Sequence, residues 1–202
     1  MNKLCDSFSK LNTKTYNFSH KEYYKKMDKE IKKIISKPES NTLTYDILDT
    51  EKTKKNKLLS LKEKQRQMKV GNIWQLMIGN YNEFTNLGNG HESGLDILSK
   101  KRKLAIEIKN RTNTDNASSK KSNLDKLSKF KKKNPEYRCI YANINDKTEE
   151  KTLIGFNKRI ICNDVEIEHQ VGYQFLTFIF GEKTEEIIKF VKNTIDKYIN
   201  LF

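Results

Sequence analysis

Two acidic residues and a lysine have a spacing that could support hydrolysis of a phosphate diester. Asp96 and Glu107 follow the pattern Asp-x10-Glu, and Lys109 lies two residues after Glu107. Two carboxylates can hold one Mg²⁺, which activates a water and neutralises the charge that develops on the phosphoryl oxygens. An ammonium group beside them can orient that water. These three residues are therefore candidate catalytic residues.

A β-hairpin would bring these residues together. The sequence predicts a short strand over residues 95–98, a polar turn over 99–103 and an alternating strand over 104–109. Side chains alternate across a strand, so Glu107 and Lys109 share one face and can meet Asp96 across the hairpin. The other interpretation is a cross-strand salt bridge on a solvated face of the sheet, which would add little stability.

The motif Glu-x-Lys by itself is not specific. It occurs at Glu30–Lys32, Glu107–Lys109 and Glu149–Lys151. The first pair lies in an expected helix, where residues two apart point to different faces, and the last lies in a charged loop. The middle pair alone lies on an alternating strand that follows a strand carrying an aspartate.

The expected fold class is α/β, with a mixed central sheet flanked by helices and a helical basic N-terminal extension. The composition changes at Gly71, so residues 1–70 are expected to form a basic helical region packed on a core of residues 71–202. The expected sheet comprises 95–98, 104–110 and 137–144, and a small hairpin joins 152–156 to 159–162. Helices are expected over 20–37, 54–70, 73–78, 122–133, 172–180 and 184–202.

The charge of the chain favours a polyanionic partner. Forty Lys and Arg residues against twenty-six Asp and Glu residues give a formal net charge of +14. Lys and Arg that displace phosphate counterions supply most non-specific affinity for nucleic acids. AT-rich coding would also raise the lysine content, and charge does not separate an enzyme from a passive binder.

Cysteine and apolar patterns exclude several other classes of protein. Cys5, Cys139 and Cys162 are far apart and odd in number, which indicates reduced thiols rather than a disulfide framework or zinc site. No run approaches the roughly 18 apolar residues of a membrane span, and the first residues lack an apolar signal core. A cytoplasmic protein without a membrane partner is expected.

Two stretches of the sequence resemble a known family. Gly94-Leu95-Asp96 followed by Ile106-Glu107-Ile108-Lys109 resembles the PD-(D/E)xK nuclease signature, with Leu95 where Pro is usual. The longer runs 90–97 and 107–119 are similar to type II restriction endonucleases, in particular the group that cuts GGNCC-like sites. The similarity covers residues 71–145 well, the C-terminal third loosely and the first 70 residues not at all.

The resemblance implies a fold, an activity and partners. The fold would be restriction-endonuclease-like, and the activity would be Mg²⁺-dependent, site-specific cleavage of double-stranded DNA. Such enzymes usually cut palindromes as homodimers and have a cognate DNA methyltransferase that acts on the same site. The basic N-terminal helices and the C-terminal helix are equal candidates for the dimer surface.

The resemblance also implies roles for individual residues. Asp96 and Glu107 would be Mg²⁺ ligands, the carbonyl of Ile108 would complete the oxygen shell, and Lys109 would orient the water. Many family members place another acid before the first strand. Glu92, four residues before Asp96, is the first candidate for it.

Glu83 and Gln75 are the alternatives for that third group. Glu92 has the further interpretation of an ordinary exposed loop acid. A lone histidine in a glycine-rich loop is more often exposed than catalytic, so His91 is left out of the candidate set.

The polar stretch after Lys109 is expected to contact DNA. Arg and Asn can bond base edges, whereas Ser and Lys can bond phosphates. A solvent-exposed loop is the alternative. The candidate DNA-binding residues are Arg111, Asn113, Asn116, Ser118, Ser119, Lys120 and Lys121.

Two other functions remain open from the sequence. A repair or junction nuclease of the same fold would share the three catalytic candidates but recognise the shape of DNA instead of its sequence. A basic DNA-binding protein without catalysis would need no Mg²⁺, so metal dependence separates it from both nucleases.

Overall fold

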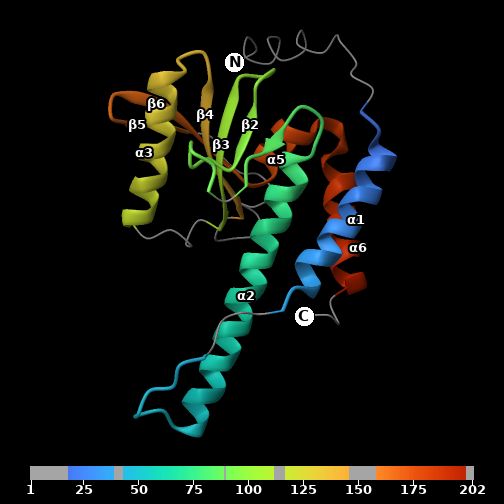
Figure 1. Cartoon of the computed structure of the whole chain (residues 1–202), viewed down its shortest axis with the longest axis vertical. Coiled ribbons are helices and arrows are strands. Elements are labelled where there is room, and N and C mark those ends of the chain that lie inside the picture. The colour runs from blue at the N-terminus through green and yellow to red at the C-terminus, as the bar shows by residue number, and fades with distance from the viewer. Residues whose placement is uncertain (1–17, 39–42, 89, 112–116, 146–157, 199–202) are drawn as a thin grey trace.

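The computed structural model describes residues 18–38, 43–88, 90–111, 117–145 and 158–198. Within these ranges, six strands form one mixed sheet in the order β1-β2-β3-β4-β6-β5 (Figure 1). Neighbouring strands are antiparallel from β1 to β3, parallel across β3, β4 and β6, and antiparallel between β6 and β5. The strands are β1 Thr85–Asn86, β2 Ile97–Ser99, β3 Leu104–Arg111, β4 Arg138–Asn145, β5 Lys158–Cys162 and β6 Val165–Val171.

Helices cover both faces of this sheet, which confirms the α/β prediction. The helix α3 packs on one face, and α1, α2, α5 and α6 gather on the other (Figure 1). None of the described helices is both long enough and apolar enough to span a membrane. The helices are α1 His20–Ser36, α2 Glu51–Gly79, α3 Ala117–Lys133, α5 Gly172–Phe180, the 3-10 turn η2 Gly181–Lys183, and α6 Thr184–Tyr198.

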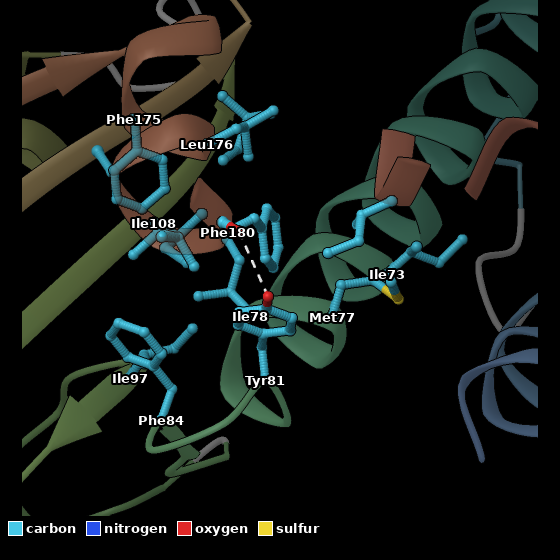
Figure 2. Close-up of a cluster of buried hydrophobic side chains, with 14 of the residues drawn as sticks. Ile73, Met77, Ile78, Tyr81, Phe84, Ile97, Ile108, Phe175, Leu176 and Phe180 are labelled. Atoms are coloured by element: carbon cyan, nitrogen blue, oxygen red, sulfur yellow. Dashed lines mark hydrogen bonds between the residues drawn. The ribbon is translucent and has the colours of Figure 1, made fainter. Parts of the chain in front are cut away.

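The alternation of β3 divides the interior into two clusters. Leu104, Ile106 and Ile108 enter the larger cluster. Figure 2 shows Ile108 in this cluster together with side chains of α2 and α5. Ala105 enters the smaller one with Leu124 of α3. The predicted two faces of β3 are confirmed, and the face that carries Glu107 and Lys109 is the one that α3 covers.

The helix α1 forms because its apolar residues recur every four positions. The side chain of Ser19 caps it by accepting a hydrogen bond from the backbone N–H of Glu22. At the other end of the helix, the backbone of Lys37 is extended, which is the conformation that a residue before proline, here Pro38, prefers. The buried stripe consists of Tyr23, Met27, Ile31 and Ile35.

The expected helices 54–70 and 73–78 are one helix. The helix α2 runs from Glu51 to Gly79, so it continues through Gly71 and through the proposed boundary between residues 70 and 71. Its buried residues all lie in its C-terminal half, whereas its N-terminal half extends away from the rest of the molecule (Figure 1). A glycine inside a helix costs about 1 kcal/mol relative to alanine. The packing of the buried end of α2 outweighs this cost at Gly71, so the helix continues. The division into two domains stays a prediction.

Only the second strand of the expected hairpin near the C-terminus lies among the described residues, as β5. The strand β5 pairs with β6, a strand that was not predicted, and residues 152–156 lie outside the described residues. Asn163 and Asp164 join the two strands, with φ of 49° and 62°. Two consecutive residues with positive φ are typical of the tight hairpin turn that Asn and Asp tolerate.

The C-terminal end of α2 packs closely against β1. A Cβ on Gly79 would lie 2.7 Å from the backbone N and Cα of Asn86. We expect Gly79→Ala to lower the free energy of unfolding by about 1–3 kcal/mol, because a backbone contact cannot move aside. Urea denaturation followed by circular dichroism would measure the change.

Gly71→Ala is the matched control in the same helix. Its added Cβ would meet the Cβ of Asn110 at 3.7 Å, an ordinary contact. Alanine favours helix over glycine, so this variant should gain about 0.5–1 kcal/mol. Equal effects of the two substitutions would contradict the close crossing of α2 and β1.

Candidate active site

Asp96 and Glu107 meet across the β2–β3 hairpin. Ile97 pairs with Ile106, so continuing the antiparallel register by one residue places Asp96 opposite Glu107. The carboxylate of Asp96 accepts a hydrogen bond of 2.7 Å from the backbone N–H of Ile108. This bond holds Asp96 against β3, just before β2 begins.

Glu107 lies on a buried face of the sheet. It is 2% exposed, because α3 covers this face. Lys109 donates a hydrogen bond of 2.9 Å to Glu107 Oε1, and its own side chain is 25% exposed. The two residues do form a salt bridge, but it lies at the inner edge of a covered face and not on a solvated face of the sheet. The catalytic role of these residues stays a prediction.

Burial dominates the electrostatics of both acids. Burial raises the pKa of Asp96, and the Ile108 N–H, Lys109 and Lys126 lower it by a smaller amount. Burial also raises the pKa of Glu107, the neighbouring charge of Asp96 raises it further, and Lys109 and Lys126 oppose both. Burial and mutual repulsion make it costly to ionise both carboxylates together. A bound cation would reduce this cost.

This burial gives a prediction for the metal-free protein. The pKa of Glu107 is raised above its unfolded value, about 4.3. The folded chain then binds more protons than the unfolded chain above that pH, so stability falls as the pH rises through the folded pKa. Glu107→Gln mimics the protonated form. We expect it to melt above wild type in EDTA at neutral pH, with the difference disappearing below about pH 4.

Glu168→Gln is a control with the opposite sign. Burial raises the pKa of Glu168, but bonds of 2.7 and 2.8 Å from Arg138 outweigh burial, and the pKa is lowered. Its carboxylate adds stability that is lost as the pH falls through its folded pKa. We expect Glu168→Gln to melt below wild type at neutral pH. Thermal scans across pH would measure both variants, and a destabilised Glu107→Gln would contradict the first expectation.

The donor set fits a hard divalent cation. Glu107 Oε2 is buried and has no hydrogen-bond partner among the described residues. Within the same residues, no three His, Cys, Asp or Glu side chains cluster closely enough to hold a metal ion. Further ligands beyond Asp96 and Glu107 would come from the backbone, water or a substrate phosphate, as is usual for Mg²⁺.

A polar pocket opens beside Lys109. It has a volume of about 400 Å³, and its lining is formed by Lys109, Ser118, Ser119, Ser122 and Asn123. The helix α3 begins at Ala117, earlier than expected, so the two predicted serines lie in its first turn rather than in a loop. Serine is well tolerated there because its hydroxyl can bond unpaired backbone groups.

The other predicted DNA contacts lie in different places. Arg111 ends β3, and its Nη2 lies 3.4 Å from Glu63 Oε1 of α2. Lys120 is half-buried and Lys121 exposed, and both lie on α3. Asn113 and Asn116 lie outside the described residues.

One comparison with known proteins identifies the family of this chain. The family model described as Eco47II restriction endonuclease matches residues 2–200. The chain belongs to the Eco47II restriction endonuclease family. It is therefore a type II restriction endonuclease, and DNA is its substrate. Searches among curated proteins and solved structures found no match.

The candidates for a third acid in this Eco47II-family chain are dispersed. Glu83 forms an ion pair with Lys101 in the β2–β3 turn, away from the two carboxylates. Glu92 is exposed in the turn before β2, where His91 bonds Ser93. Gln75 is half-buried on α2. A role for Glu92 in this Eco47II-family site stays a prediction.

Sequence reasoning missed one charged residue of this Eco47II-family site. Lys126 acts electrostatically on both Asp96 and Glu107. It follows Ser119, Ser122 and Asn123 at helical spacing, on the side of α3 next to the apolar stripe. That spacing was present in the sequence, but the helix had to be placed over β3 before it pointed to the acids.

Proposed function

We propose that the chain cuts double-stranded DNA at a specific site by Mg²⁺-dependent hydrolysis, as a member of the PD-(D/E)xK superfamily. One observation carries the proposal. A buried carboxylate oxygen of Glu107, which has no hydrogen-bond partner in the described part of the chain, lies beside Asp96, and Lys109 joins this pair to the polar pocket. Carboxylates that face a cation, with an ammonium next to them, meet the needs of phosphodiester hydrolysis.

Each residue of the site has a distinct task in this proposal. Asp96 and Glu107 would hold Mg²⁺ with the carbonyl of Ile108, and the ion would supply Lewis acidity and a more acidic water. Lys109 would orient the attacking water and stabilise charge on the phosphate, since its ammonium is fixed by Glu107 at 2.9 Å. Ser118 and Ser119 would bond the phosphate group in the pocket.

We propose base recognition by residues near the end of β3. Arg111, held toward α2 by Glu63, would approach the bases together with Asn113 and Asn116. Lys120 and Lys121 would contact phosphates. A GGNCC-like site is the proposed target, and a cognate methyltransferase would protect that site.

We propose a homodimer, because two-fold protein symmetry matches a palindromic site. One face of α6 already packs inside the chain, where the ring of Phe190 lies tilted against that of Tyr24 with 4.7 Å between the ring centroids. The segment before α2 and the part of α2 that ends at Met68 carry most of the exposed large apolar side chains of the described residues. These are Tyr45, Ile47, Leu48, Leu58, Leu59 and Met68. This surface is therefore the proposed dimer contact, and sedimentation equilibrium would show whether two copies associate.

Cleavage of linear phage-length DNA tests the proposal. Discrete bands with Mg²⁺, absent in EDTA and with Asp96→Ala, would support a site-specific metal-dependent endonuclease, and sequencing the ends would map the site. A smear, or cleavage of branched DNA alone, would indicate a structure-specific nuclease. Intact DNA across several divalent metals, with binding unchanged by Asp96→Ala, would overturn the proposed chemistry.

A further inference from the structure

A polar stripe on α3 runs alongside its apolar stripe. Leu124 and Leu127 pack on the sheet in the smaller cluster. The polar stripe comprises Ser119, Ser122, Asn123 and Lys126, which recur at intervals of three and four residues. Its first three members line the pocket beside Lys109. Lys126 continues the stripe by one turn, toward the loop that carries Asp96.

The stem of Lys126 is held over Gly94. A Cβ on Gly94 would lie 3.2, 3.4 and 3.7 Å from Cδ, Cε and Cγ of Lys126, and the residue has φ of +65°. The absence of a side chain at Gly94 lets the lysine pass directly across the loop two residues before Asp96. Lys126 Nζ donates one long hydrogen bond, 3.5 Å, to Asn123 Oδ1.

Lys126 also balances the charge of the site. The ammonium groups of Lys109 and Lys126 lower the pKa of both Asp96 and Glu107. The two carboxylates are thus matched by two ammonium groups before any cation binds. A divalent cation would make the site positive, which suits a DNA phosphate. An ammonium has three donors, so Lys126 can bond both Asn123 and a ligand oxygen.

We propose that Lys126, with Ser122 and Asn123, forms a subsite that binds a backbone phosphate of the DNA strand being cut. The inference rests on the proposed nuclease function and adds these residues to it. The lysine would contribute a charge-assisted hydrogen bond, Asn123 and Ser122 would supply neutral donors, and Gly94 would keep the lysine stem in place.

Binding of a short duplex that carries the mapped cleavage site tests the subsite. The duplex is titrated in EDTA over a range of salt concentrations with wild type, Lys126→Met and Lys126→Arg. Methionine keeps an unbranched stem over Gly94 but has no charge. We expect Lys126→Met to weaken DNA binding about fivefold to tenfold at low salt. The slope of the logarithm of the binding constant against the logarithm of salt concentration should fall in size by about one, as expected for the loss of one phosphate contact. Lys126→Arg should retain the wild-type slope.

Lys129→Met is the matched control, because Lys129 is exposed on the same helix and acts on Asp125 instead of the two acids. It should bind as wild type does. Unchanged affinity and slope in Lys126→Met, with wild type active and all variants equally stable to heat, would overturn the subsite alone. A wild-type protein that neither binds nor cuts DNA would instead overturn the proposed function.

Discussion

Asp96→Asn is expected to lower the single-turnover rate of DNA cleavage by about 10³-fold or more, because a lost metal ligand removes several kcal/mol of transition-state stabilisation. The asparagine oxygen can still accept the 2.7 Å hydrogen bond from the Ile108 N–H. The local fold should therefore persist while one negative ligand disappears. Quenched-flow cleavage of a mapped site at saturating protein would measure the rate.

The same variant should lose its response to metal. Mg²⁺ that binds the folded chain raises its melting temperature, and a variant without the ligand charge should show a much smaller rise. Asp196→Asn on α6 is the matched control, since Asp196 is exposed. Wild-type cleavage by Asp96→Asn, at wild-type Mg²⁺ concentrations, would rule out Asp96 as a ligand.

Lys109→Met is expected to lower the same rate by about 10²-fold, because a fixed ammonium stabilises charge that develops on the phosphate and on the water. The lysine is only partly exposed, and its Nζ is held 2.9 Å from Glu107 Oε1. The methionine keeps most of the stem, so the loss should fall on the rate more than on DNA binding. Lys192→Met, an exposed position on α6, is the control.

The pH dependence separates this role from a structural one. Lys109 lowers the pKa of both Asp96 and Glu107, so its removal should raise them. Cleavage that requires the ionised acids should then begin at a higher pH in Lys109→Met than in wild type. A uniform loss of rate with an unmoved pH profile would contradict an electrostatic role for Lys109.

Local patterns predicted the elements whose periodicity is complete within one segment. The alternation over 104–109 predicted the two faces of β3, and the structure places those faces in two separate clusters. The apolar run ending before Gly181 predicted α5 over the residues that form it. In both segments the signal lies in neighbouring residues, so no distant contact was needed.

Other elements depended on their surroundings. A change in composition at Gly71 suggested two helices, but burial of the C-terminal half supports α2 as one helix. The strand β6 carries His169 and Gln170, which weaken its apolar pattern. Pairing with β4 and β5 on both sides stabilises it as a strand.

In the candidate site too, some features follow from local sequence and others from tertiary packing. The sequence alone determined the partnership of Asp96, Glu107 and Lys109, because a hairpin brings together residues that are close along the chain. The tertiary structure decided that Glu107 is buried and that Lys126 lies near the two acids, because both follow from the packing of α3 on the sheet. Periodicity specifies which residues share a face of an element. Only the packing of apolar faces against each other decides which distant polar side chains are brought to the same place.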